Sequence, residues 1–245
     1  WREKEGIFQQ ENTPVARENI LSPSDLKFPE KSSSSKSPRV SSLRSARLSS
    51  EDFFPGTSQQ ALFGIVQGGR HEELRKMSAN QISALDFDGF GIGGTFIKED
   101  MSTAVRWVNE ILPEEKPRHL LGVGEPIDIF LGVENGCDTF DCVAPTRMAR
   151  NGTLHTTHGR ISILNSSFRD DLGKVDESCK CYTCTHYNRS ILAHLFRAKE
   201  MLAATLATIH NLHFIVNMTD KIRQSIIDDN FTEYKDEFLK NYYGI

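Results

Sequence analysis

Long apolar runs, positive charge and cysteine are all scarce in this chain of 245 residues. It contains no run of 18 apolar residues, and nothing near Trp1 looks like a signal peptide, so we expect a cytoplasmic protein with no membrane partner. The formal net charge of −4 excludes a generally basic coat for nucleic acids, and any RNA contact must therefore come from a local patch. In other respects the composition is that of an ordinary globular protein.

Three of the five cysteines lie within six positions. In a chain without a secretory signal, such a cluster is typical of metal binding rather than of disulfides. The spacing C-x-C-x-x-C places three thiols on one tight loop, at Cys179, Cys181 and Cys184. They can occupy three corners of a tetrahedron around Zn²⁺, and a fourth protein ligand would make the site structural rather than catalytic. The alternative interpretation is three free, buried thiols.

Four histidines that follow the cysteine cluster are candidates for the fourth ligand: His186, His194, His210 and His213. His186 follows Cys184 by two residues, which is too close to reach around the ion. His194 and His213 lie on expected helices, where they would also serve as ordinary surface or packing residues. His210 comes from the far end of a long expected helix, so its coordination would fasten that helix to the cysteine loop.

The first 58 residues differ in composition from the rest. Residues 31–50 hold ten serines and five basic residues but no acidic residue. Apolar side chains are too sparse there to offset the entropy of ordering, so we expect segment 1–58 to be mostly disordered or loosely attached. A solvated linker is favoured over an RNA-contacting or phosphorylated tail.

Short apolar runs alternate with helical patterns from residue 61 to residue 143. The expected strands cover 61–66, 90–94, 119–124 and 139–143, and the first is expected to be buried on both faces. The first intervening helix carries an apolar stripe of Leu74, Met77, Ile82 and Leu85. The second carries a stripe of Met101, Ala104, Val105, Val108 and Leu112. Four strands alternating with three helices indicate a parallel α/β sheet over 59–152, either part of a (β/α)8 barrel or an open doubly wound sheet.

The remaining segment, 153–245, is expected to form a zinc-binding region with C-terminal helices. A hairpin is expected over 154–164 with its turn at His158 and Gly159. Beyond the cysteines, one helical stripe runs through Ile191, Leu195, Ala198, Leu202, Leu206 and Ile209 and continues through Ile215, Met218, Ile222 and Ile226. Such a stripe is usually core, with a dimer surface as the alternative.

Several motifs occur in a fixed order along the chain: F-G-I-V-Q-G-G at 63–69, G-I-G-G at 91–94, L-G-V-G at 121–124, F-D-C-V-A-P-T-R-M-A-R-N-G at 140–152, the cysteine cluster, and T-I-H-N-L at 208–212. This ordered set resembles the tRNA-guanine transglycosylase (queuine tRNA-ribosyltransferase) family from about Ala61 to the C-terminus. The resemblance implies a (β/α)8 TIM-barrel fold, of which this chain has the C-terminal half, with a zinc-binding subdomain. It also implies that His210 is the fourth zinc ligand.

The activity implied by the resemblance is base exchange in tRNA. Guanine at the anticodon wobble position is replaced by queuine or another 7-deazaguanine, and the carboxylate matching Asp141 attacks the ribose C1′ carbon to form a covalent intermediate. From the residues alone, Asp141 could equally cap the turn at Thr146 and Arg147 or pair with Arg150.

The resemblance also assigns binding residues. Those that contact the deazaguanine base are Gln67, Gly93, Gly94 and Leu121. Those that contact the tRNA anticodon loop are Gly122, Val123, Gly124, Glu125, Pro126, Ile127, Asp128, Thr146, Arg147, Met148, Ala149 and Arg150. The alternatives are that Gln67 caps a helix, that Leu121 is core, and that the two arginines are only solvated.

The N-terminal part departs from the family pattern. The family has an earlier half-barrel that supplies two further aspartates, and residues 1–60 contain no stretch that matches it. The expectation is therefore a fragment, a truncated gene, or a half-barrel completed by a partner, such as a second copy or another family member. The alternative function is a non-catalytic, zinc-stabilised subunit for tRNA binding or dimerisation.

Overall fold

Four parallel strands organise the first part of the computed structural model, which describes residues 60–94 and 98–245. They form a sheet in the order β1-β2-β3-β4, in which every neighbouring pair is parallel. Their bounds are Phe63–Val66, Gly89–Ile92, Arg118–Leu120 and Thr139–Phe140. The expected parallel α/β sheet is thus confirmed, and within the described residues it does not close into a barrel. The expected low-complexity segment 1–58 lies outside the described residues.

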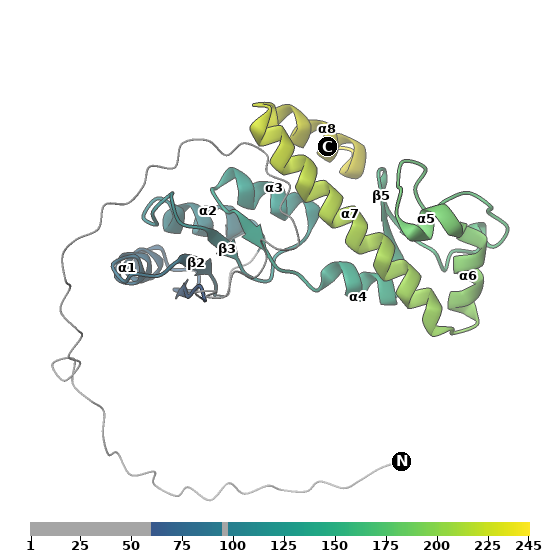
Figure 1. Ribbon diagram of the computed structural model, residues 1–245, viewed down its shortest axis with the longest axis horizontal. Coiled ribbons are helices and arrows are strands. Elements are labelled where there is room, and N and C mark those ends of the chain that lie inside the picture. The colour runs from purple at the N-terminus through teal and green to yellow at the C-terminus, as the bar shows by residue number, and fades with distance from the viewer. Residues whose placement is uncertain (1–59, 95–97) are drawn as a thin grey trace, which may run out of the picture. The chain divides into compact units, whose positions relative to one another are not determined.

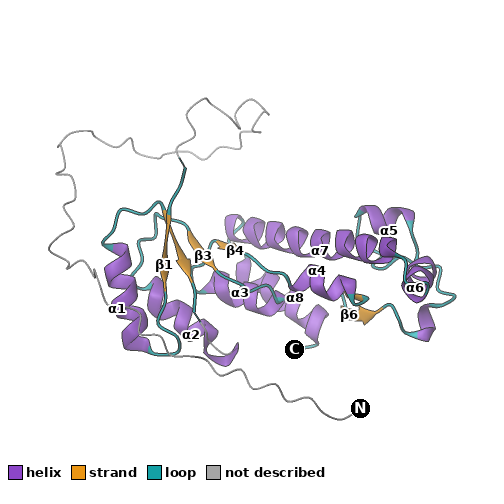
Figure 2. Cartoon of the chain, turned by 90° about the horizontal axis from the view of Figure 1, so that it is seen from below, coloured by secondary structure: helices purple, strands orange, loops and turns teal. Residues whose placement is uncertain are grey.

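Three helices connect the strands: α1 (Glu72–Ser83), α2 (Lys98–Asn109) and α3 (Pro126–Glu134). Figure 1 shows these helices beside the sheet, and Figure 2 shows the strands of the sheet from below. The apolar stripe expected on α2 is confirmed, because its members are buried against Phe90, Ile92 and Leu120. Pro126 begins α3, and Gly136 follows its end with a φ of +85° that other residues rarely adopt.

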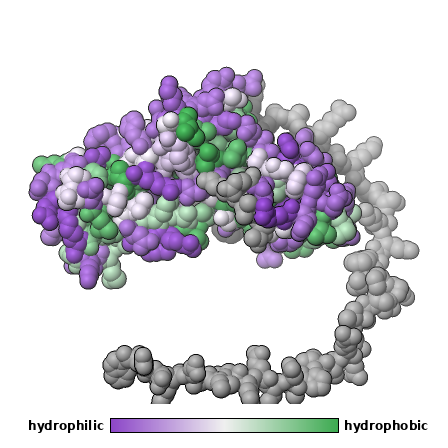
Figure 3. Space-filling model, turned by 180° about the vertical axis from the view of Figure 1, so that it is seen from behind, coloured by the Kyte–Doolittle hydropathy of each residue, from purple (hydrophilic) through white to green (hydrophobic). Residues whose placement is uncertain are grey.

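The burial expected for the first strand and first helix is wrong. Phe63 and Ile65 of β1 are 37% and 43% exposed, because one face of the strand has no covering layer among the described residues. On α1, Leu74 and Met77 are exposed, as is Leu85 just after the helix. Ile82 packs on the core of the sheet, and Arg75 and Ala79 are buried. The reason is the side chain of Arg75, which donates to the carbonyls of Gly69 and Gly93 and so fixes the rotation of the helix. Figure 3 shows apolar surface interspersed with polar surface on one side of the molecule.

The second part of the chain begins with α4 (Ala144–Arg150) and an antiparallel hairpin. The hairpin strands are β5 (Thr153–Thr156) and β6 (Gly159–Ser162), close to the expected positions, and Gly159 has a φ of +100° in the turn. The following elements are the 3-10 helix η1 (Ser166–Phe168), α5 (Tyr182–His186), α6 (Arg189–Arg197), α7 (Met201–Ile227) and α8 (Phe231–Tyr243).

The long apolar stripe expected beyond the cysteines is interrupted. Lys199 has a φ of +58°, and this left-handed residue separates α6 from α7. Members of the stripe that are exposed are Ile191, Ala198, Leu202 and Ile226. Three members on α7, Leu206, Met218 and Ile222, are buried as expected, and the buried face of this helix also includes Ala203, Ala207, His210 and Asn211.

By length and composition alone, α7 could cross a membrane. Its surroundings are those of a core helix, because it packs against α4, α5, α6, β5 and α8. Its buried Asn211 accepts a hydrogen bond from the amide of His155 and donates to the carbonyls of Pro145 and Thr153. A buried amide with three protein partners fits a helix that packs inside a folded unit.

An aromatic cluster joins the sheet region to the C-terminal helices. Phe130 of α3 lies 5.1 Å, between ring centroids, from Phe238 of α8, and Ile129 packs with Met218 and Ile222 of α7. The three helices meet in Figure 1 above the end of the sheet. This cluster is separate from the core of the sheet and from the core around the cysteines.

Candidate active site and metal centre

The three clustered cysteines and His210 come together in space. Their ligand atoms all lie within 4.8 Å of one another, and such a group could hold a metal ion. The Nδ1 atom of His210 is 3.7 Å from the Sγ of Cys179, 3.6 Å from that of Cys181 and 3.3 Å from that of Cys184. The structure thus selects His210 from the four candidate histidines, although His213 also places Nδ1 3.5 Å from Cys179.

Local structure explains why these side chains converge. Cys181 is the N-cap of α5, and its sulfur accepts from the amide of Cys184, so one turn of helix brings two thiols to the same side. His210 is fully buried on α7, and its Nε2 donates to the carbonyl of His155 at 2.6 Å. That bond orients the ring and leaves Nδ1 to face the sulfurs, as in the outer shell of metal sites.

The electrostatics of the cluster favour a positive charge at its centre. Burial lowers the pKa of His210, but the contacts with the sulfurs of Cys179 and Cys181 outweigh burial and raise that pKa to about 10. Hydrogen bonds with Cys179 and Cys184 hold the pKa of Cys181 below its usual range. A buried thiolate next to a retained proton is an environment in which a cation can replace the proton.

Asp141 follows β4 and is exposed at the carboxyl end of the sheet. Its Oδ1 accepts from the amide of Gly122 at 2.9 Å and lies 3.1 Å from Nε2 of His119. The other ring nitrogen of His119 is 2.8 Å from the hydroxyl of Thr139. Among the described residues Asp141 pairs with His119 and not with Arg150, so the structure does not support the alternative of an ion pair with Arg150.

These contacts keep the carboxyl ionised. The hydrogen bond from the Gly122 amide and, after it, the contact with His119 hold the pKa of Asp141 below its usual range. Gly122 has a φ of +74°, which favours glycine, and this conformation places its N–H beside the carboxylate. The site therefore presents an oriented, negatively charged oxygen at the face where parallel α/β folds place their chemistry.

The residues that the resemblance assigns to base binding also lie together. A Cβ built on Gly93 would meet Nε2 of Gln67 at 2.7 Å and a methyl of Leu121 at 3.4 Å, and one on Gly94 would meet Oε1 of Gln67 at 3.0 Å. Any larger residue at Gly93 would displace the amide of Gln67. The buried guanidinium of Arg75 donates to the carbonyls of Gly69 and Gly93, so it connects the turn after β1 with the turn after β2.

The two segments expected to contact RNA flank Asp141. Segment 122–128 leads from β3 into α3, and segment 146–150 lies in α4, which starts three residues after Asp141. Arg147 and Arg150 are exposed on α4 and make no ion pair within the described part of the chain. Glu125 is different, because its carboxylate pairs with Arg160 of β6.

Sequence reasoning missed His119, Arg75 and Arg160. The signal for His119 was its place two residues before Leu121 on a strand adjacent to the one that ends at Asp141. No pattern in the sequence marks Arg75 or Arg160, because their partners are backbone carbonyls and residues distant in the chain.

Comparisons with known proteins agree with these observations. The model of the family described as "Queuine tRNA-ribosyltransferase" matches residues 20–244. The chain is 48% identical over 191 residues to the queuine tRNA-ribosyltransferase of Caldanaerobacter subterraneus subsp. tengcongensis, a match that covers 77% of this chain and 51% of that protein. It is 45% identical over 186 residues to the enzyme of that name from Streptococcus gordonii, covering 75% and 49%.

A third relative, the queuine tRNA-ribosyltransferase of Thermodesulfovibrio yellowstonii, is 45% identical over 205 residues, which cover 81% of this chain and 54% of that protein. The chain spans about half the length of the curated relatives it matches. Because the family model matches most of the chain, the chain belongs to the queuine tRNA-ribosyltransferase family.

Proposed function

We propose that this chain carries the nucleophile and the base-binding face of a tRNA-guanine transglycosylase, which replaces the wobble guanine of a tRNA by queuine or a related 7-deazaguanine. The observation that carries the proposal is the position of Asp141. Its carboxylate is oriented by Gly122 and His119 at the same end of the sheet as Gln67, Gly93, Gly94 and Leu121. In this proposal the parallel sheet is the C-terminal half of a (β/α)8 barrel.

In the first step Asp141 attacks C1′ of the target ribose. The bond from Oδ to C1′ forms as the bond from C1′ to guanine N9 breaks, and the electron pair leaves with the base, which takes up a proton. In the second step N9 of the deazaguanine loses its proton to solvent and attacks C1′, and the bond from C1′ to the carboxylate breaks. Two displacements through a glycosyl ester retain the configuration of the sugar and divide one difficult substitution into two.

The base would lie between Leu121 and the glycine turns. The amide of Gln67 can both donate to and accept from the edge of a purine-like ring, and the absence of side chains at Gly93 and Gly94 leaves the backbone within reach. Arg75 fixes both turns from below, so these groups are held in place before the base arrives.

The metal is proposed to be Zn²⁺, held by Cys179, Cys181, Cys184 and His210. In a tetrahedral site with Zn–S near 2.3 Å and Zn–N near 2.0–2.1 Å, the N-to-S edges are about 3.6 Å. The observed separations of 3.3–3.7 Å fit that geometry. Four protein ligands leave no open position, so the metal would stabilise the fold and not take part in base exchange.

The tRNA would be bound through its anticodon loop by segments 122–128 and 146–150. Arg147 and Arg150 supply exposed guanidinium groups next to Asp141, and such groups suit phosphate oxygens. We propose that the chain acts together with a further family chain, because apolar residues of β1 and α1 remain exposed. We also propose that the protein is cytoplasmic.

The test is detection of a covalent adduct between tRNA and this chain on a denaturing gel, where it separates by size from an adduct of a full-length family member. The chain is tested alone and mixed with that member. Asp141→Asn keeps the size of the side chain but removes its charge, so we expect tRNA affinity and metal content to be retained and the adduct to disappear. An adduct that persists in this variant would place the nucleophile elsewhere.

The second candidate function is a non-catalytic subunit for tRNA binding or dimerisation. The observation that favours it is the four-stranded sheet, which does not close within the described residues. Absence of an adduct on the wild-type chain itself, both alone and in the mixture, would support this second function when the full-length member forms its own adduct on the same gel.

A further inference from the structure

Segment 122–128 is held through Gly122, Gly124 and Glu125, and also by a hydrogen bond between Tyr243 of α8 and the backbone of Ile127. Gly122 donates to Asp141. Gly124 lies so close to Cys142 that a Cβ there would be only 2.1 Å from the Cβ of Cys142. Glu125 pairs through its carboxylate with Arg160 on the hairpin of the metal-binding region. The segment therefore depends on residues outside the sheet for its position.

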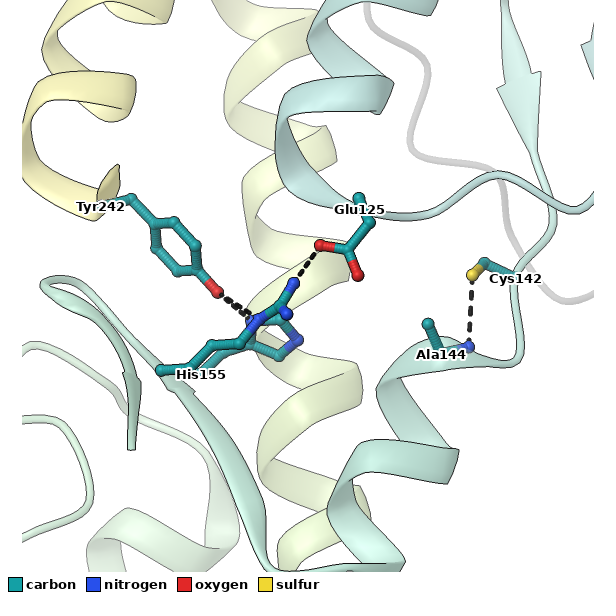
Figure 4. A network of polar contacts seen from close by, with 6 residues as sticks. Glu125, Cys142, Ala144, His155 and Tyr242 are labelled. Carbon is teal, nitrogen blue, oxygen red and sulfur yellow. Dashed lines mark hydrogen bonds and ion pairs between the residues drawn. The ribbon is translucent and has the colours of Figure 1, made fainter. Parts of the chain in front are cut away.

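The Glu125 side chain is not used for helix capping. Its backbone is extended and its carbonyl accepts from the amide of Ile129 at 3.0 Å, so Glu125 begins α3 through its main chain. Its carboxylate instead reaches Arg160, and the two side chains are 32% and 34% exposed. Figure 4 shows Glu125 on one side of this contact and Tyr242 on the other. Because both side chains are largely buried, solvent and salt weaken the attraction between them less than in a fully exposed ion pair.

Tyr242 of α8 braces the guanidinium from the other side. Nε of Arg160 donates to the hydroxyl of Tyr242 at 3.3 Å, and that hydroxyl is 2.5 Å from Nδ1 of His155. Because a guanidinium cannot accept, the Tyr242 oxygen accepts from Arg160. His155 is itself buried, so its contact with Tyr242 joins that hydroxyl to the interior of the metal-binding region.

His155 in turn contacts the metal-binding helix. Its carbonyl accepts from Nε2 of His210, and its amide donates to Asn211. Its ring stacks on Phe214 of α7 with 5.0 Å between centroids. A continuous series of contacts thus runs from α7 through β5, α8 and β6 to the first residue before α3.

We propose that Arg160 is a positioning residue, which fixes segment 122–128 for RNA recognition by joining Glu125 to Tyr242 and the core of the metal-binding region. The inference rests on the proposed function for the identity of the ligand, a tRNA anticodon loop. It differs from a direct role of Arg160 in phosphate binding, because the guanidinium is already engaged on both sides.

The first experiment measures the position of the segment without RNA. Hydrogen exchange of the amides of 122–128 is compared in the wild-type chain, Arg160→Met and Lys235→Met. Lys235 is a matched control, because it also joins α8 to α3, through a 2.7 Å ion pair with Glu134 at the other end of the helix. We expect exchange in 122–128 to become about fivefold faster in Arg160→Met and to stay unchanged in Lys235→Met. Equal protection in Arg160→Met and the wild type would overturn the proposal.

The second experiment measures tRNA affinity and its dependence on salt. Arg160→Met is expected to weaken binding about three- to tenfold with an unchanged salt slope, whereas removal of a direct phosphate contact lowers the slope by about one unit. Glu125→Gln breaks the same pair from the other side, so it too is expected to weaken binding. If Arg160 bound phosphate directly, removal of the neighbouring negative charge would leave binding unchanged or tighten it, and that result would overturn the proposal.

The two levels of inference can fail separately. A wild-type chain that binds no tRNA, alone or with a full-length family member, would refute the proposed function. The exchange measurement would still decide whether Arg160 holds segment 122–128 in place.

Discussion

At the scale of single residues, the contact between His119 and Asp141 links strand pairing to chemistry. His119 and Thr139 are direct partners in the β3–β4 register. The Thr139 hydroxyl therefore contacts one nitrogen of the His119 ring and orients the other nitrogen toward the Asp141 carboxylate. The ring and the Gly122 amide both favour the ionised form of Asp141. The Asp141 carboxylate is therefore charged at any pH above the lowered pKa.

We predict that His119→Ala shifts the acid side of the pH profile for adduct formation to higher pH. The sign follows because the folded-state pKa of Asp141 is depressed in the wild type, and removing one stabilising partner raises it. The rate of adduct formation is measured across the acid range. His158→Ala, at an exposed histidine of the hairpin turn, is the control and should leave the profile unchanged. A profile of His119→Ala that coincides with the wild type would contradict the assigned contact.

What could be foreseen of single residues depended on how local their chemistry is. The cysteine triplet was predictable because its spacing is short and its ligand chemistry is specific. The fourth ligand was not determined by the residues alone, since four histidines were available, and only the fold brings His210 to the sulfurs. The burial of Arg75 was unpredictable, because its acceptors are carbonyls of turns that follow two different strands.

At the scale of elements, the periodicity of apolar residues predicted burial correctly only where another apolar element packs against the stripe of the helix. It succeeded for α2, which packs on the centre of the sheet. It failed for α1, whose apolar stripe has no covering layer among the described residues, and for the region where Lys199 divides α6 from α7. A lysine in the left-handed conformation leaves no mark in the pattern of apolar residues, so the end of one helix and the start of the next at this position could not be predicted from the sequence.

The element that would depend most on a metal bound at the cysteine cluster is α7. His210 and Asn211 are adjacent and buried, and they connect this helix to the cysteine loop, to β5 and to α4. We predict that His210→Ala lowers zinc content below one ion per chain and reduces the free energy of unfolding by more than about 4 kcal/mol, an effect typical of removing a structural metal. Elemental analysis and denaturant unfolding provide the two measurements.

His194→Ala is the control for that variant, since His194 is exposed on α6 and lies outside the cluster. It should keep the full zinc content and nearly the full stability. Full zinc occupancy in His210→Ala would show that another residue, with His213 the nearest at 3.5 Å from Cys179, supplies the fourth ligand.

At the scale of the whole described unit, the sheet region and the metal-binding region are joined by few but specific contacts. The aromatic cluster of α3, α7 and α8 is apolar, and the network of Glu125, Arg160 and Tyr242 is polar. Between them, α4 carries Arg147 and Arg150 from the end of the sheet toward the hairpin. In the proposed function, the exposed face of α4 is the part of the RNA-binding surface that lies between the two regions.

We predict that the double variant Arg147→Gln, Arg150→Gln weakens tRNA binding and lowers the slope of log affinity against log salt by about one unit for each phosphate that the protein no longer neutralises. The double variant Arg197→Gln, Arg223→Gln removes the same charge from exposed positions of α6 and α7 and serves as the control. If general attraction between the protein and RNA dominated, the two double variants would weaken binding equally. A salt slope reduced only in the first variant assigns the contact to α4, beside the carboxylate that is proposed to attack the ribose. An unchanged slope in both would move the RNA-binding surface away from α4.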